Sequence, residues 1–287
     1  MRVAVTGARG QLGAAVVHAC ASRHEVLALG RQDLDVADDR AVESMMGRLR
    51  PDVIINCAAY NDVDGAESHP VDALNANAFA VRALAAAAET IGAVLVHYGT
   101  DFVFDGTTTS PYKEDDRPNP RSVYAASKLL GEWFAADASR SYVLRVESLY
   151  GRAPGAAAPK GTVAGILNKL AAGQEAKVFH DRIVSPTYVI DAARATLELV
   201  ERAAPFGIYH CVNSGLCTWL ELARELAALL AVEPRLIPVA MADMPLPAER
   251  PRYCALSNEK LRSVGIVMPT WQDGLRRFVE SEKVRSG

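Results

Sequence analysis

Residues 2–14 carry the sequence RVAVTGARGQLGA, in which a short apolar run leads directly into a glycine-spaced turn. In such a GxxGxxG loop one glycine permits a tight turn, one lets the backbone approach a pyrophosphate, and one lets helix and strand pack closely. The start of the following helix offers N–H groups and the positive end of its dipole to the phosphates. The stretch therefore predicts a dinucleotide-binding loop. Its expected contact residues are Gly7, Arg9, Gly10, Gln11, Leu12 and Gly13.

Short apolar runs alternate with longer segments of helical period through the first 150 residues. The predicted strands are residues 2–6, 25–29, 53–57, 94–98 and 142–146, and the predicted helices are residues 11–21, 38–49, 71–91 and 124–138. Repeated strand–helix units predict a parallel sheet covered by helices on both faces. We therefore expect an α/β protein with a doubly wound parallel sheet, the Rossmann fold.

The sequence becomes less regular after residue 150, and this change predicts a second part. We expect a dinucleotide-binding domain over residues 1–150, to which segments near 181–212 return, and a smaller interleaved substrate-binding part over residues 151–287. Residues 151–161 are rich in Gly, Ala and Pro and predict a mobile loop. Further predicted elements are helices at 162–172, 188–202, 218–230 and from 271, strands at 177–180 and 207–212, and a proline-rich segment at 234–251.

Composition excludes several classes of protein. Lys and Arg total 31 and Asp and Glu total 34, so the formal charge of −3 disfavours a nucleic-acid-binding protein. No apolar run approaches the roughly 18 residues of a membrane span. The five cysteines are scattered without a CxxC pair, which disfavours a disulfide framework or a zinc site and favours a reducing cytoplasm. No two histidines have metal-ligand spacing, so no metal is expected.

The end of the second predicted strand bears on the choice between NADP and NAD. An acidic residue there would bind the ribose 2′-hydroxyl, but the sequence has Arg31, and Arg9 lies in the glycine loop. Two guanidinium groups favour a 2′-phosphate, because arginine binds phosphate through a bidentate fork. Asp33 and Asp35 are close by in sequence, so NADH remains an alternative cofactor. We expect NADPH as the preferred cofactor.

Tyr124 and Lys128 form the only YxxxK pair in the chain. Side chains at i and i+4 are neighbours on a helix, and an ammonium group beside a phenol lowers the phenol pKa from about 10. A phenol tuned in this way exchanges a proton with a ketone or alcohol oxygen. Thr100 follows the fourth predicted strand, at the sheet edge where open α/β sheets bind ligands, and its hydroxyl can bond the reacting oxygen.

These motifs resemble the extended branch of the short-chain dehydrogenase/reductase superfamily, and nearly the whole chain resembles the dTDP-4-dehydrorhamnose reductase family. The similar stretches are residues 56–60, 63–64, 66–67, 99–106, 112–114, 118–120, 124–128, 131–132, 181–188, 250–251, 256 and 260–261. The resemblance implies reduction of a 4-keto-6-deoxy sugar nucleotide by NADPH or NADH. It implies that Tyr124 protonates the 4-keto oxygen, that Lys128 lowers the pKa of Tyr124 and holds the nicotinamide ribose, and that Thr100 steadies the carbonyl.

The resemblance also implies further contacts and shows three departures. The implied cofactor contacts are Arg31, Asp35, Val36, Cys57, Ala58, Ala59, Tyr60, Asn77, Tyr124 and Lys128, and the implied substrate contacts are Thr100, Asp101, Phe102, Ser148 and Arg250. Ser148 stands where the family has tryptophan, Gly99 replaces a serine, and Phe102 replaces the usual tyrosine. Because a missing indole removes a large stacking surface, we expect a wider or more polar sugar pocket.

Other activities are compatible with parts of this pattern. A dehydratase of the same branch needs an acid and a base after the threonine, and Phe102 cannot act as a base. A sugar-nucleotide 4-epimerase shares the YxxxK pair and stays open. A non-catalytic cofactor-binding subunit, similar to the regulatory subunit of methionine adenosyltransferase, is a further alternative that the intact Tyr124, Lys128 and Thr100 argue against. A homodimer is a further expectation.

Overall fold

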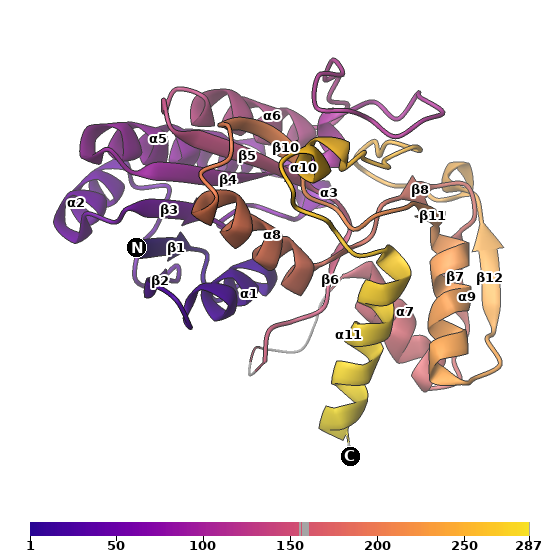
Figure 1. Ribbon diagram of the computed structural model, residues 1–287. Coiled ribbons are helices and arrows are strands. Elements are labelled where there is room, and N and C mark those ends of the chain that lie inside the picture. Colours follow the sequence, from indigo (N-terminus) through magenta and orange to yellow (C-terminus); the bar gives the residue numbers. More distant parts are fainter. Residues whose placement is uncertain (155, 157–160, 287) are drawn as a thin grey trace.

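A six-stranded, wholly parallel sheet forms the centre of the protein (Figure 1). The computed structural model describes residues 1–154, 156 and 161–286. The strand order is β2-β1-β3-β4-β5-β10, built from β1 (Arg2–Thr6), β2 (Glu25–Leu29), β3 (Val53–Asn56), β4 (Val94–Thr100), β5 (Ser141–Val146) and β10 (Gly207–His210). The order reverses between β1 and β3, so the predicted doubly wound α/β fold is confirmed. In the part of the chain described here, no helix is long and apolar enough to cross a bilayer.

Helices cover both faces of the sheet, as continuous apolar strands require. On one face α1 (Gln11–Cys20) packs against α8 (Val189–Glu201), over a core that includes Val3 and Val5 of β1. On the other face lie α2 (Asp39–Leu49), α5 (Ala80–Ile91) and α6 (Val123–Ala135), and Ala4 of β1 points to that side. Alternate residues of one strand thus enter different cores, because side chains alternate across a strand.

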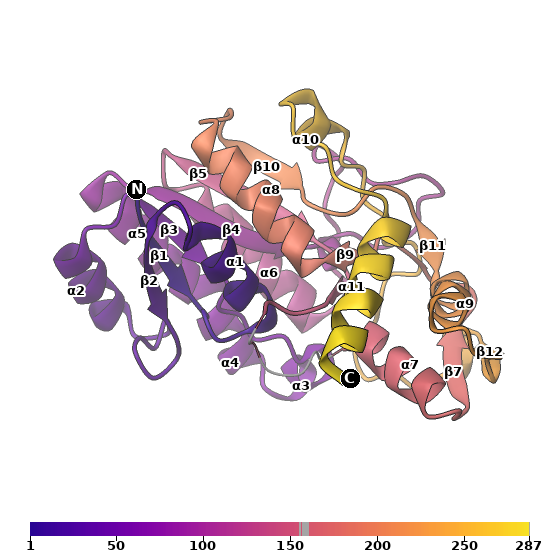
Figure 2. The same cartoon turned by 60° about the horizontal axis from the view of Figure 1, so that its bottom comes forward.

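A second group of elements lies beside the carboxyl ends of the strands (Figure 2). Helices α7 (Thr162–Ala171), α9 (Trp219–Leu230) and α11 (Trp271–Ser286) share a core with β7 (Ala176–Phe179), which pairs in parallel with β12 (Leu236–Val239). Two further small sheets join β8 (Ile183–Val184) to β11 (Cys217–Thr218) and β6 (Leu149–Tyr150) to β9 (Thr187–Tyr188). Part of the loop predicted to be mobile, residues 155 and 157–160, lies outside the described residues.

Two differences from the sequence prediction concern larger segments, beside several short strands and helices that were not predicted. The predicted helix 71–91 is divided into α4 (Pro70–Leu74), the π-helical turn η1 (Asn75–Phe79) and α5, and α3 (Val63–Ser68) precedes it. The segment predicted only as proline-rich contains β12, because Pro238 lies in a two-stranded sheet that tolerates a missing N–H. The remaining short helices are η2 (Asp101–Val103), η3 (Met241–Asp243) and α10 (Glu259–Ser263).

Candidate active site

The glycine loop connects β1 to α1 in a shape that only glycine permits. Gly7 has a φ of +62°, and a Cβ there would lie 2.6 Å from the Ala58 backbone nitrogen. A Cβ on Gly13 would lie 2.2 Å from the Gly7 carbonyl oxygen. Gly10 caps α1 without a side-chain hydrogen bond, so the first N–H groups of the helix are available to an anion. Of the other predicted contacts in this loop, Leu12 is buried in the core, and Gln11 donates to the Gly151 carbonyl over 2.7 Å.

Two arginines lie at the end of β2, where the adenosine ribose is expected. The Arg9 side chain lies over Gly30, and a Cβ on Gly30 would meet its Nε at 2.9 Å. Asp33 accepts the Gly30 N–H over 2.9 Å and lies 3.7 Å from the Arg9 guanidinium. Asp35 accepts a backbone N–H two residues further on. Both acids therefore serve local contacts, and Arg31, which directly follows Gly30, is exposed.

Asn77 anchors the loop that follows β3. Its Oδ1 accepts the Tyr60 N–H over 2.9 Å, and its Nδ2 donates to the Tyr60 carbonyl and to Ser127 Oγ of α6. The Asn77 side chain is fully buried, so it holds the loop in place from behind. The other expected cofactor contacts on this edge, Val36, Cys57, Ala58 and Ala59, are half-buried.

Tyr124 and Lys128 lie in the first turns of α6, which Ser122 caps by accepting the Ala125 N–H. Burial raises the pKa of Tyr124 to about 12, against a lowering effect of the Thr100 hydroxyl. Burial lowers the pKa of Lys128 to about 8, and Glu132 opposes this change. The Lys128 ammonium donates to the Tyr98 carbonyl over 2.6 Å. Burial is the largest effect on the phenol in this structure and raises its pKa, so the lowering by Lys128 stays a prediction.

Thr100 ends β4 and places its hydroxyl beside the phenol. Its Oγ1 donates to Asp101 Oδ1 over 3.1 Å and accepts the Phe102 N–H over 3.3 Å. The Phe102 ring meets the Tyr124 ring edge to face at 5.5 Å between centroids. The structure thus brings together four of the predicted site residues at the carboxyl edge of the sheet. Such a group can protonate a carbonyl oxygen that binds between Thr100 and Tyr124.

Gly99 is explained by the ion pair behind it. A Cβ at this position would lie 2.3 Å from Glu132 Oε1. Glu132 receives a bidentate hydrogen bond from Arg145, with the shortest contact at 2.8 Å, and both side chains are almost completely buried. A buried pair of this kind tolerates little displacement, because no water is present to replace a lost contact between the two ions. The absence of a side chain at Gly99 therefore leaves the space that the Glu132 carboxylate occupies.

Ser148 and Arg250 lie where the substrate is expected, on segments distant in sequence. Ser148 joins β5 to β6 with a φ of +44°, the left-handed conformation that most side chains avoid. Arg250 makes a bidentate ion pair with Asp64, with the shorter contact at 2.7 Å, and this pair lowers the Asp64 pKa. A diphosphate at Arg250 would share this guanidinium with Asp64.

Three residues beside this site were missed from the sequence: Glu147, Arg182 and Cys254. Each is buried, and Glu147 and Cys254 place ligand atoms within 4.8 Å of Asp101 and of each other. The sequence contains part of the information that could have indicated these residues. Glu147 is an acid directly after the predicted strand 142–146, and Arg182 belongs to a stretch that resembles the family. Their proximity depends on three segments that meet only in the folded chain.

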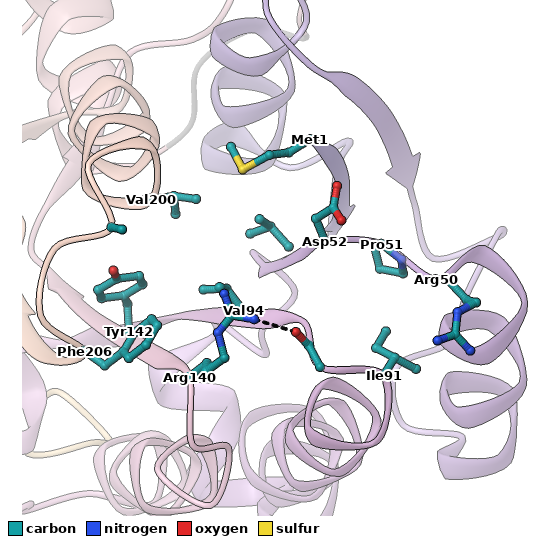
Figure 3. Close-up of a pocket in the computed structure, with 13 residues that line it drawn as sticks. Met1, Arg50, Pro51, Asp52, Ile91, Val94, Arg140, Tyr142, Val200 and Phe206 are labelled. Atoms are coloured by element: carbon teal, nitrogen blue, oxygen red, sulfur yellow. Dashed lines mark hydrogen bonds between the residues drawn. The ribbon is translucent and has the colours of Figure 1, made fainter.

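A hollow of about 450 Å³ lies at the opposite edge of the sheet and is a different place from this site (Figure 3). Its lining includes Met1, Asp52 and Val94, which lie at the amino-terminal ends of β1, β3 and β4. Open α/β sheets bind nucleotides at the carboxyl ends of their strands. The hollow is therefore on the wrong edge to hold the cofactor that the glycine loop accepts.

Comparison with known proteins agrees with the geometry. A family model described as RmlD substrate binding domain matches residues 1–284. A dTDP-4-dehydrorhamnose reductase from Sinorhizobium fredii is 35% identical over 291 residues, which cover 97% of each chain. This chain belongs to that family. The predicted membership of the dTDP-4-dehydrorhamnose reductase family is thus confirmed.

Two other relatives add cofactor and substrate chemistry within this family. The crystal structure of dTDP-4-dehydrorhamnose reductase from Bacillus anthracis in complex with NADP has a TM-score of 0.92 and 32% identity, and the match covers 98% of this chain and 99% of that one. A probable dTDP-4,6-dihydroxy-2-methyloxan-3-one 4-ketoreductase from Streptomyces antibioticus is 36% identical over 96% of this chain and 94% of its own. The family therefore contains proteins named for different keto substrates.

Proposed function

We propose that this protein is an NADPH-dependent reductase of a 4-keto-6-deoxy sugar nucleotide. The observation that carries the proposal is the meeting of Tyr124 and Thr100 at the carboxyl edge of β4, on the same edge of the sheet as the glycine loop. When bound, the reduced nicotinamide supplies a hydride to the carbonyl carbon. The chain supplies the proton and the orientation, and NADPH is supported by the NADP complex of the Bacillus anthracis relative.

The residues of this chain have distinct parts in the proposed reaction. Tyr124 donates its phenolic proton to the carbonyl oxygen, and the high pKa of the buried phenol keeps that proton in place until the oxygen becomes basic. Thr100 directs its hydroxyl toward the same oxygen and fixes the carbonyl orientation. Lys128 carries a positive charge at neutral pH and offers its remaining donors to the ribose.

The cofactor site is proposed from the surfaces described above. The backbone N–H groups after Gly10 bind the pyrophosphate, and Arg9 with Arg31 binds the 2′-phosphate. The half-buried loop after β3 covers the adenosine, with Asn77 as its anchor. The chain fits this group because no side chain caps the first N–H groups of α1, and because Gly7 and Gly13 let the loop pack closely against the backbone after β3 and against itself.

The substrate site is proposed at Phe102, Ser148 and Arg250, whereas Asp101, also expected to contact the substrate, is buried behind Thr100 and supports the site from there. Ser148 leaves open the volume that an indole would occupy, so a bulkier or differently oriented sugar can enter. The ketoreductase name of the Streptomyces antibioticus relative supports variation of the sugar within the family. We therefore expect a keto sugar other than dTDP-4-dehydrorhamnose to be the better substrate.

The test is a screen of 4-keto-6-deoxy sugar nucleotides with NADPH, followed by loss of the reduced nicotinamide absorbance. A reductase consumes one NADPH per sugar reduced. A 4-epimerase interconverts sugars without net cofactor consumption, and a non-catalytic subunit binds NADPH without turnover. Either of the last two results, across the whole screen, would contradict the proposal.

We also infer a homodimer and a cytoplasmic location. Phe79 and Trp133 are 44% and 63% exposed on the face formed by η1 and α6, and apolar groups of this size support burial against a second copy. Light scattering after gel filtration measures the mass, and Trp133→Glu is expected to yield monomers.

The scattered cysteines support a reducing compartment.

A further inference from the structure

A buried cluster of ionisable side chains lies directly behind Thr100. Asp101, Glu147 and Cys254 place their ligand atoms within 4.8 Å of one another, and the three residues are 3%, 2% and 1% exposed. Arg182 is 8% exposed and donates to Cys254 Sγ over 3.4 Å. The cluster therefore contains two carboxyl groups, one thiol and one guanidinium, all with little exposure to solvent.

Each carboxyl group has one oxygen fixed by the protein and one oxygen without a partner. Asp101 Oδ1 accepts from Thr100, and Glu147 Oε2 accepts the Ser185 N–H over 2.6 Å. Asp101 Oδ2 and Glu147 Oε1 are buried and have no hydrogen-bond partner among the described residues. Two acceptor oxygens on adjacent carboxylates cannot satisfy each other unless one of them carries a proton.

The charges around the pair also favour one retained proton. Burial raises the pKa of Asp101 to about 6, against the lowering effect of Arg182. Burial raises the pKa of Glu147 well above its usual value, and the nearby Asp101 adds to the rise. One guanidinium balances one carboxylate, so the second carboxyl group stays neutral. The ionisable and polar groups that face the pair are Thr100, Tyr124, Ser148, Arg182, Ser185, Cys217, Tyr253 and Cys254.

We propose that Asp101 and Glu147 hold a shared proton that restores the Tyr124 phenol, through the Thr100 hydroxyl, after each reduction. This inference rests on the proposed reductase function and adds to it the source of the proton. Glu147 acts through Asp101 and Thr100 without touching the substrate, so it is a proton-supply residue. The path runs from the phenol to the Thr100 hydroxyl that affects its pKa, then to Asp101, which Thr100 hydrogen-bonds, and then to Glu147, whose carboxylate lies within 4.8 Å of that of Asp101.

The step balances in protons without a further reactant. The phenolic O–H bond breaks when Tyr124 protonates the sugar oxygen, which leaves a phenolate. The Thr100 O–H bond then breaks toward the phenolate, and Asp101 returns a proton to Thr100 Oγ1. That proton is the one the pair shares, which reaches Asp101 from Glu147, so both carboxyl groups are left ionised. One proton from solvent restores the pair when product leaves, and no electrons move in any of these transfers.

Two other interpretations of the cluster fit the contacts less well. A divalent cation at Asp101, Glu147 and Cys254 would lie beside the Arg182 guanidinium, which already donates to Cys254 and repels positive charge. Direct resupply from Lys128 would need its ammonium to contact the phenol, and the hydrogen bond that this ammonium makes is to the Tyr98 carbonyl. A shared proton leaves both of these contacts in place.

Glu147→Gln tests the proposal with little change of shape. Glutamine keeps an oxygen for the Ser185 N–H but cannot lose a proton at accessible pH. We expect kcat at neutral pH to fall about tenfold, less than the roughly 10²–10⁴-fold contribution of a direct general acid. We expect KM to change less than about twofold, because Glu147 does not touch the substrate.

The pH profile and the solvent isotope effect separate proton supply from a structural role. In the wild type kcat falls with rising pH as the pair loses its proton, and the apparent pKa belongs to the pair. In Glu147→Gln this dependence disappears, because Asp101 beside Arg182 then stays ionised. A plot of kcat against deuterium fraction is curved in the wild type, since several protons move, and linear in the variant. Unchanged kcat, pH profile and isotope plot in Glu147→Gln would overturn the proposal.

A matched control and a spectroscopic measurement complete the test. Glu114→Gln changes another partly buried carboxyl group with a raised pKa, which accepts the His210 N–H and lies outside the cluster, and its kcat should equal that of the wild type. Infrared spectra at neutral pH should show a protonated carboxyl group that Glu147→Gln lacks and Glu114→Gln retains. Absence of this band from the wild type overturns the proposal even if Glu147→Gln does not fold. A wild type without reductase activity removes the proposed function, and a reductase that is indifferent to Glu147→Gln removes only the proton supply.

Discussion

Replacing Tyr124 by phenylalanine separates proton donation from the packing of the ring. The substitution removes one oxygen and keeps the edge-to-face contact with Phe102 at 5.5 Å. Thr100 keeps Asp101 as its hydrogen-bond partner, so no buried donor loses its last acceptor. We therefore expect the variant to fold with a free energy of unfolding within about 1 kcal/mol of the parent.

The expected loss of activity follows from the part assigned to the phenol. A general acid in this position supplies about 10²–10⁴-fold, which corresponds to about 2.7–5.4 kcal/mol of transition-state stabilisation. The ring itself remains in the site, so the Kd for NADPH should change by less than about twofold. The fold loss in kcat is thus expected to exceed the fold change in the NADPH Kd by at least about fifty times.

Steady-state reduction of the best substrate from the screen measures kcat, and fluorescence titration measures the NADPH Kd. Tyr142→Phe is the matched control, because the Tyr142 hydroxyl is also buried but donates to the Ala204 carbonyl, away from Thr100. Its kcat should be unchanged, although loss of that bond lowers its stability by about 1–3 kcal/mol. Turnover of Tyr124→Phe within twofold of the parent would refute the assignment of the phenol as acid.

Three further predictions concern the cofactor, the lysine and the sugar. Arg31→Ala should reduce the preference for NADPH over NADH, and titration of both cofactors would contradict the arginine assignment if the parent shows no preference or the variant keeps it. The pKa of about 8 lies below the usual Lys value, so the unfolded chain binds the additional proton between about pH 8 and 10.4, and stability rises with pH in that window. Between pH 7 and 9 the wild type should gain about 1 kcal/mol relative to Lys128→Met in denaturant unfolding, and a loss or no change would contradict the buried, charged lysine. Ser148→Trp should raise kcat/KM for dTDP-4-dehydrorhamnose, whereas parent turnover of about 10⁴ M⁻¹s⁻¹ or more would show that the indole is dispensable.

Local signals account for what the sequence predicted well. The five strands of the first half lie within about two residues of the predicted positions, because each is an apolar run bounded by polar or glycine residues. The glycine loop follows from spacing alone. The adjacency of Tyr124 and Lys128 follows from helix geometry, and Thr100 follows from the end of a strand.

Long-range contacts account for what the sequence did not predict. The break in the helix before α5 accompanies hydrogen bonds from Asn77 to Tyr60 and Ser127, which lie 17 and 50 residues away in sequence. The direction of the Tyr124 pKa depends on burial, which no spacing rule reports. The cluster around Glu147 likewise joins segments whose meeting is a property of the whole fold.

The position of α8 and β10 has a consequence for the order in which the chain is made. These elements complete the cover of α1 and the edge of the sheet beside β5, yet they are synthesised after residue 188, beyond α7 and β7. A nascent chain that has reached residue 150 exposes the apolar face of α1 and an unpaired edge on β5. At roughly 5–20 residues per second, that state lasts about 3–12 seconds until residue 210 is added. A protein truncated after residue 150 would never acquire α8 and β10. It would keep an unpaired strand edge on β5, which favours aggregation.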